Sequence, residues 1–237
     1  MRIIFKFPTR SRPKKFLETL ANLQTYCNLR EHQCIVSYDI DDKTMDSETI
    51  IRAENEYGAV CMPGVSKNKI DAVNRDIIIH PSWDILVVIS DDMRFVRKDA
   101  DKIIIEDMTK YFPDTDGVLH YNDGNQKGNV MTMSIIGRKY YERDKYVYNP
   151  AYESVWCDAE ETEKAYMRGK YKYMGDSNII FNHLHPAWNL SDWDDQYRKT
   201  EDAETEQKDK ALFLSRRDRN YFMNEHEIVN NFKYGKL

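Results

Sequence analysis

Residues 85–92 read Ile-Leu-Val-Val-Ile-Ser-Asp-Asp, an apolar run that ends in a serine and two adjacent carboxylates. An apolar run of this length predicts a strand that is covered on both faces, as in a parallel sheet. Two carboxylates directly after a buried strand repel each other unless positive charge lies close to them. The stretch therefore predicts a divalent-metal site at the end of a buried strand. A turn or helix N-cap is the other interpretation, since aspartate favours both.

The residues before this stretch alternate between strand-like and helix-like patterns. We predict strands at 3–7, 34–38 and 59–62 and helices at 47–57 and 69–79. Ser11 is expected to cap a further helix between the first two strands, and Gly58 to end the helix at 47–57. This alternation predicts an α/β fold with a mostly parallel sheet and helices on both sides. The sequence contains no GxGxxG fingerprint and no P-loop, which weakens the dinucleotide and NTPase interpretations.

The second half of the chain is less regular. We predict helices at 100–112 and 158–168 and strands at 118–121, 130–136, 171–174 and 179–185. After about Asp192 the residues are mostly polar, and we interpret them as a helical tail.

Composition limits the class of protein. The chain has 237 residues with a formal charge of -5, which suits one domain and argues against a dedicated nucleic-acid coat. No apolar stretch approaches the roughly 20 residues of a membrane helix, and the first residues lack the apolar region of a signal peptide. The four cysteines form no CxxC pair, which favours reduced thiols. We therefore expect a soluble, cytoplasmic protein.

Polar clusters follow four of the predicted strands. Ligands of open α/β sheets bind beyond the carboxyl ends of the strands, so these clusters are expected to meet. Basic and acidic groups at one edge suit an anionic ligand that brings its own divalent cation, such as a nucleotide diphosphate. The clusters are residues 8–12, the aspartates 39, 41 and 42, residues 66–69, and residues 90–92.

Three further patterns each allow two interpretations. His183 and His185 lie on one face of a strand and can supply a metal ligand and its supporting partner, although an isolated pair more often makes ordinary hydrogen bonds. An acidic segment at 158–161 follows an aromatic stretch; it fits a catalytic base beside an apolar acceptor pocket, or the usual charge of a helix N-terminus. The arginines 216, 217 and 219 fit phosphate contacts or, more often, a solvated helix face.

Together these motifs resemble the family-2 type of nucleotide-sugar-dependent glycosyltransferase, which has the GT-A fold. The resemblance covers about residues 1–190 and follows the order of the family's motifs. PTRSRP (8–13) resembles the family's first nucleotide-contacting loop, and SYDIDD (37–42) resembles its acidic strand end that contacts uracil. GVSKNKIDA (64–72) resembles the family's Gly-x-x-Ala-Arg-Asn-x-Gly-Ile segment, and VVISDDMRF (87–95) resembles its metal-binding DxD strand end. WCDAEETEKAYMRGKY (156–171) resembles the acidic segment that supplies the catalytic base.

The resemblance implies roles for individual residues. Ser90 stands in the place of the first acid of a strict DxD, and Lys67 in the place of the motif's arginine. The implied nucleotide-sugar-binding residues are Pro8, Thr9, Arg10, Arg12, Asp39, Asp41, Lys67, Asn68 and Asp91. The implied metal ligands are Asp92 and Asp91, to which we add His183 and His185. The implied catalytic base is Asp158, Glu160 or Glu161.

The resemblance also implies a function and a domain division. We expect Mn²⁺- or Mg²⁺-dependent transfer of a hexose or pentose from a nucleotide-sugar, first of all a UDP-sugar, to a hydroxyl acceptor. That acceptor is a saccharide or, for a phage enzyme in the host cytoplasm, a hydroxymethylated base in DNA. Residues 1–190 form the GT-A domain, with a nucleotide-sugar-binding half at 1–92 and an acceptor-side half at 93–190, and 191–237 form a helical extension.

Two other hypotheses stay open at this point. One is a metal-dependent phosphoesterase or nuclease that uses Asp91, Asp92, His183 and His185. The other is a binding module that holds a nucleotide-sugar and has lost turnover, which the replacements at Ser90 and Lys67 would fit.

Overall fold

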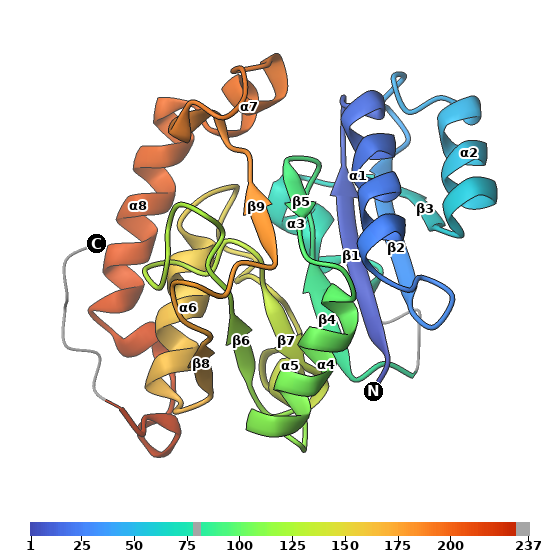
Figure 1. Ribbon diagram of the computed structural model, residues 1–237. Coiled ribbons are helices and arrows are strands. Elements are labelled where there is room, and N and C mark those ends of the chain that lie inside the picture. The colour runs from blue at the N-terminus through green and yellow to red at the C-terminus, as the bar shows by residue number, and fades with distance from the viewer. Residues whose placement is uncertain (78–81, 231–237) are drawn as a thin grey trace.

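The computed structural model describes residues 1–77 and 82–230, and in this part of the chain the strands form a seven-stranded and a two-stranded sheet (Figure 1). The large sheet has the order β3-β2-β1-β4-β7-β6-β8. Only β7 runs antiparallel to its neighbours in it. The strands are β1 (Ile3–Thr9), β2 (Gln33–Asp39), β3 (Val60–Gly64), β4 (Ile85–Val88), β6 (Val118–His120), β7 (Ile135–Gly137) and β8 (Tyr171–Tyr173), and the small antiparallel sheet joins β5 (Met93–Phe95) to β9 (Phe181–His183).

Helices cover both faces of the large sheet. One hydrophobic core lies under α1 (Pro13–Tyr26), α2 (Ser47–Tyr57) and α4 (Ala100–Tyr111). The other lies under α3 (Lys69–Asn74), α5 (Arg138–Asp144), α6 (Cys157–Met167) and α8 (Ala203–Arg217), while the short α7 (Asp195–Thr200) stands above β9 (Figure 1). The predicted α/β fold with a mostly parallel sheet is confirmed.

Alternation along β4 explains why its residues are apolar without interruption. Ile85 and Val87 face the core under α1 and α4, whereas Leu86 and Val88 face the core under α3 and α5. Successive side chains of a strand point to opposite faces, so a strand in the middle of a two-sided sheet needs an apolar residue at every position. β1 pairs with β4 in parallel and is buried in the same way.

Predictions about individual helix ends mostly hold, and one of them, the Ser11 cap, is wrong. The helix at Ser47–Tyr57 begins at an Asp46 cap, whose side chain accepts a hydrogen bond from the Thr49 N–H, and ends at Gly58 with a φ of 65°. Ser11 does not cap α1: the N-cap is Arg12, and Ser11 has a φ of 61°. The Ser11 backbone N–H instead donates to Asp42 Oδ2 at 2.6 Å, which ties this turn to the loop after β2.

Two further elements are shorter than predicted. Helix α3 ends at Asn74, where the expected helix continued to 79; residues 78–79 of that prediction lie outside the described residues. The strand expected at 130–136 is reduced to β7, because the chain before it leaves the sheet and the Met131 N–H donates to the Thr162 hydroxyl of α6.

The four cysteines are free and buried, as expected for thiols that pack in the core. Within residues 1–77 and 82–230, no helix has the length and apolar character that crossing a membrane requires.

Helix α8 packs beside α6 (Figure 1), with Phe213 in the second core. Its buried Asp209 accepts hydrogen bonds from the backbone N–H groups of Glu153, Ser154 and Val155 at 2.8–3.3 Å. The last helices are therefore bound to the body of the protein, and α8 fixes the loop that leads into α6. The division at residue 190 stays a prediction.

Candidate active site

The carboxyl ends of β1 to β4 open into one cavity of about 830 Å³, which is within the size range of ligand-binding pockets. Thirteen of the fifteen site residues named from the sequence line it; the described lining leaves out Glu160 and Glu161. The thirteen are Pro8, Thr9, Arg10, Arg12, Asp39, Asp41, Lys67, Asn68, Asp91, Asp92, Asp158, His183 and His185.

At the carboxyl end of β2, Arg10 joins Asp39, the last residue of that strand, to Asp41, and all three residues line the cavity. Its guanidinium lies 2.7 Å from Asp39 and 2.7 Å from Asp41. The second oxygen of Asp39 accepts the backbone N–H of Ser66 at 2.8 Å, so this carboxylate connects the loops after β1 and β3. Arg75 supports the same end by donating to the Ser66 hydroxyl at 3.0 Å and to the Tyr38 carbonyl at 2.7 Å. The sequence analysis did not identify Arg75.

Asp91 and Asp92 both line the cavity but have different environments. Burial, opposed by the Arg12 guanidinium at 2.8 Å, raises the pKa of Asp91 to about 6. Burial would also raise the pKa of Asp92, but the hydrogen bond and charge of His183 at 3.2 Å hold that pKa well below its usual range. Hydroxyl groups of Ser90 and Tyr197 also donate to Asp92. Asp92 therefore stays ionised well below neutral pH, whereas Asp91 takes up a proton near pH 6.

The two histidines have different partners. His183 lies between Asp92 and Asp123; burial lowers its pKa, but these carboxylates outweigh burial and raise the pKa of His183 to about 9. His185 comes after the end of β9, where its Nδ1 accepts the Ala187 N–H at 3.2 Å and its Nε2 lies 3.2 Å from Glu201. Only the first of the two is in contact with the Asp91–Asp92 pair.

These residues suit a cation that arrives with a phosphate ligand. Among the described residues, no three or more histidines, cysteines or carboxylates are grouped so as to enclose a metal ion. Mg²⁺ is commonly bound through one or two carboxylates and the substrate's phosphates, without an all-protein cage. The carboxylates of Asp91 and Asp92 provide the donor type that Mg²⁺ or Mn²⁺ accepts. The imidazole of His183, whose buried Nδ1 has no hydrogen-bond partner, becomes a further ligand where a cation replaces its proton.

The acidic residues at the start of α6 lie in two places: Asp158 lines the cavity, and Glu160 and Glu161 are buried away from it. Asp158 lies in the cavity wall, its Oδ1 accepts the Ala159 N–H at 2.9 Å, and burial raises its pKa. Glu160 instead binds Arg216 at 2.7 and 2.9 Å and the Tyr152 hydroxyl at 2.7 Å, and Glu161 is buried 3.6 Å from Lys164. A helix turns by about 100° per residue, so residues two positions apart point to nearly opposite sides.

Residues of α7, which the sequence analysis assigned to an extension, complete the site. Asp194 caps α7 and binds Arg12 at 2.6 Å and Lys15 at 2.8 Å. The buried Tyr197 ring lies 3.8 Å from the Arg12 guanidinium, and its hydroxyl donates to Asp92 at 2.6 Å. The Asp194-x-x-Tyr197 pattern was a visible sign of a helix start. Nothing local shows that this helix lies on the strand-end cluster.

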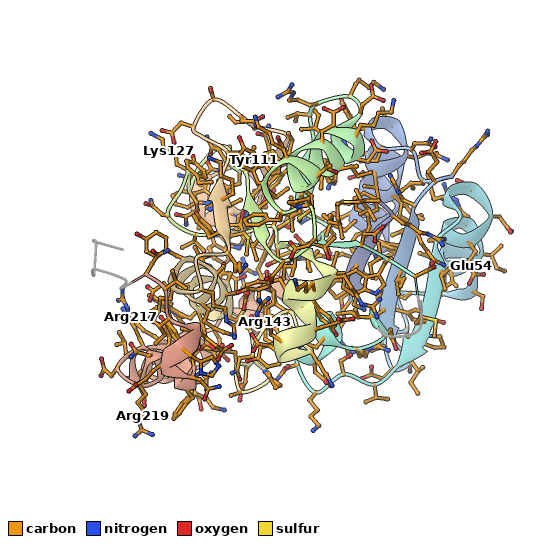
Figure 2. The ribbon with its side chains drawn as sticks, turned by 90° about the horizontal axis from the view of Figure 1, so that it is seen from below. Glu54, Tyr111, Lys127, Arg143, Arg217 and Arg219 are labelled. Carbon is orange, nitrogen blue, oxygen red and sulfur yellow. The ribbon has the colours of Figure 1, made fainter. Side chains whose placement is uncertain are left out.

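The arginines near the end of α8 are mostly occupied within the protein. Arg216 binds Glu160, and the Arg217 guanidinium lies 2.9 Å from Glu163. Arg219 extends away from the body of the protein near Arg217 (Figure 2). The alternative of an arginine cluster that binds phosphates is therefore not supported for Arg216 and Arg217.

Comparison with known proteins gave matches among solved structures; no protein-family model and no curated protein sequence matched. The chain is similar to S. aureus TarS, with a TM-score of 0.63 and 14% identity over 95% of this chain; it spans 44% of that longer chain. TarS 1–349 in complex with UDP-GlcNAc matches with a TM-score of 0.60, 14% identity, and 92% and 73% coverage of the two chains.

A mannosyltransferase from Pyrobaculum calidifontis, in complex with GDP-Man and Mn²⁺, matches with a TM-score of 0.60 and 11% identity over 95% of this chain and 77% of that chain. At such identities the likeness concerns the fold. The chain thus has the GT-A-type fold of nucleotide-sugar glycosyltransferases, as the sequence motifs predicted.

Proposed function

We propose that this protein is a metal-dependent glycosyltransferase that moves a sugar from a nucleotide-sugar to a hydroxyl acceptor. The observation that carries the proposal is the order of groups in one cavity, which follows the order of the strands. The Arg10–Asp39 pair lies at the carboxyl ends of β1 and β2, the Asp92–His183 pair at the ends of β4 and β9, and Asp158 at the start of α6. We assign the first pair to the nucleoside of the donor, the second pair to its diphosphate, and Asp158 to the catalytic base.

The donor end is assigned from hydrogen-bonding capacity. Asp39 and Asp41 accept hydrogen bonds from a base or ribose, and Arg10 holds both carboxylates in place. Asp91, Asp92 and His183 would hold the cation, for which Mn²⁺ is the first choice, since a similar mannosyltransferase structure contains it. When bound, this cation offsets the charge that develops on the leaving diphosphate. UDP-sugars are the first donors to test, and the sugar is a hexose or pentose.

The residues of the chain then carry out a single displacement. The Asp158 carboxylate accepts the proton of the acceptor hydroxyl, and the acceptor oxygen forms a bond to the anomeric carbon. The bond from that carbon to the diphosphate oxygen breaks, and its electron pair leaves on the nucleoside diphosphate. The raised pKa of Asp158 makes it a stronger base than an exposed aspartate. Direct attack inverts the configuration at the anomeric carbon.

The other hypotheses have weaker support. A two-metal phosphoesterase requires more converging ligands than the described residues group at this site. A DNA acceptor would need basic side chains, and Arg216 and Arg217 are engaged by Glu160 and Glu163.

Four free cysteines fit a reducing compartment, and we propose the cytoplasm.

The test is a donor panel with product analysis. Purified protein is incubated with UDP- and GDP-sugars and hydroxyl acceptors, with and without Mn²⁺, and the released nucleotide and the anomeric configuration of the product are measured by NMR. We expect release of a nucleoside diphosphate, dependent on Mn²⁺ and absent in Asp92→Asn. Release of a nucleoside monophosphate, or cleavage of a phosphoester in place of sugar transfer, would overturn the proposal in favour of the hydrolase.

A further inference from the structure

Three of the four tryptophans of the chain line the same cavity as the strand-end cluster. Trp188 and Trp193 lie on the segment between β9 and α7, with side chains that are 40% and 44% exposed. Trp156 is the N-cap of α6 and stands two positions before Asp158. A large aromatic residue exposed in a cavity does not contribute to the core as a buried one does, so Trp188 and Trp193 are available to a ligand. Trp156 is half-buried and packs on Phe213 with ring centroids 5.2 Å apart, so only the part of its ring that lines the cavity can meet a ligand.

Neighbouring aromatic rings hold Trp193 in a fixed orientation. Its ring meets His185 edge to face with centroids 5.8 Å apart and Tyr197 at 5.9 Å. Tyr197 is in turn fixed by its hydrogen bond to Asp92. The exposed indole is thus coupled to the groups assigned to the diphosphate centre.

Trp156 is held in an uncommon backbone conformation. Its φ is 64°, in the left-handed region that a bulky residue rarely adopts and that is typical of functional sites. The hydrogen bonds from Ser154 and Val155 to Asp209 of α8 maintain the loop that leads into it. This conformation packs the Trp156 ring on Phe213 of the second core while the residue lines the same cavity as Asp158.

The charges around these rings disfavour a phosphate-rich acceptor. Glu201 and Glu206 line this part of the cavity. Lys69 lies 3.7 Å from Glu201, and the Arg10 guanidinium lies 2.7 Å from both Asp39 and Asp41. Binding of a polyphosphate chain depends on cationic side chains that can neutralise it, and here acidic groups already face the cations.

We propose that Trp156, Trp188 and Trp193 form an acceptor subsite that takes the ring of a neutral saccharide. This inference rests on the proposed transferase function and names its acceptor class. The C–H groups on one face of a sugar ring are apolar and carry slight positive charge, and they complement the negative face of an indole ring. A sugar stacked there presents its hydroxyls at the edge of the ring, and one of them can reach Asp158.

The test measures the KM for the acceptor and the KM for the donor in variants assayed with Mn²⁺. Trp188→Ala and Trp193→Ala should each raise the KM for a neutral disaccharide acceptor about ten-fold, the size expected for one aromatic stacking contact, while the donor KM stays within two-fold of wild type. Trp193→Phe should recover part of the loss. Leu190→Ala is the matched control, because Leu190 is 48% exposed on the same segment and outside the described lining of the cavity.

A second measurement does not depend on turnover. Titration with neutral mono- and disaccharides should change the tryptophan fluorescence of the wild-type protein, with a smaller change for Trp188→Ala and Trp193→Ala. An unchanged acceptor KM in both variants would overturn the inference, and so would transfer to hydroxymethylated DNA with none to neutral sugars. If no donor is turned over at all, the proposed function fails instead, and the fluorescence titration still decides whether the aromatic subsite binds sugars.

Discussion

Replacing Asp158 with asparagine separates a catalytic base from a helix-terminal charge, because the two roles predict opposite effects on stability. Burial raises the pKa of Asp158, so the ionised form is less favourable in the folded than in the unfolded protein. Such a group lowers the free energy of unfolding as pH rises from the ordinary aspartate pKa of about 4 through the raised pKa. At neutral pH, Asp158→Asn removes this cost and keeps an oxygen for the Ala159 N–H.

The expected result is a loss of transfer without a loss of stability. General-base catalysis contributes about 10²–10⁴-fold, so kcat should fall by that factor while the donor Kd hardly changes. The melting temperature at pH 7 should equal or exceed that of wild type. If Asp158 served only the helix dipole, the variant would instead lose about 0.3–1 kcal/mol of stability and keep its transfer rate.

Neighbouring carboxylates supply the controls. Glu160→Gln breaks a buried pair with Arg216 and should cost about 3 kcal/mol of stability while the folded fraction keeps its transfer rate. Glu161→Gln should also leave the transfer rate unchanged, since Glu161 is buried beside Lys164. The reasoning is refuted if Asp158→Asn transfers normally while either glutamine variant does not. If all three variants transfer normally, a base from this segment is excluded, and a retaining mechanism becomes the better account.

Three further predictions concern other parts of the structure. Asp92→Asn should abolish Mn²⁺-dependent donor binding measured by calorimetry. The variant should still fold, since this carboxylate follows the end of β4. Normal Mn²⁺-dependent affinity in the variant would contradict the metal assignment. Arg216→Ala should lower the stability measured by urea unfolding by about 3 kcal/mol, because Glu160 loses its partner; an unchanged midpoint would show that the pair contributes little. Burial lowers the pKa of Lys6 from 10.5 to about 7, so the free energy of unfolding should rise with pH across that interval; a Lys6→Met variant with the same rise would disprove this origin.

Local patterns in the sequence predicted the parts of the structure that depend on neighbouring residues. The run at Ile85–Ile89 predicted burial on both faces of a strand, and the helix at Ser47–Tyr57 was placed by its periodicity and by Gly58. The convergence of the strand-end clusters followed from the parallel sheet, since parallel strands bring their carboxyl ends to one edge.

Contacts between distant segments could not be predicted in this way. Arg12 and Asp194 are 182 positions apart, and Tyr197 and Asp92 are 105 apart. No periodicity or spacing in the sequence predicts such pairs. The sequence analysis therefore placed α7 in an extension, although Asp194 and Tyr197 contact the residues of the site. The same holds for Glu160, whose buried partner Arg216 is 56 positions away, whereas Glu161 lies 3.6 Å from Lys164, three positions further along α6.

The most direct test of the metal-dependent donor site is a thermal-unfolding experiment with UDP, GDP and CDP, each with and without Mn²⁺. A ligand that binds the folded protein at about 100 times its Kd adds roughly 2.7 kcal/mol of stability. We predict that one of the nucleotides stabilises the protein by this order when Mn²⁺ is present and far less without it, and that Asp92→Asn removes the difference. No stabilisation by any nucleotide with Mn²⁺ would contradict the account, and so would a stabilisation that Asp92→Asn leaves unchanged.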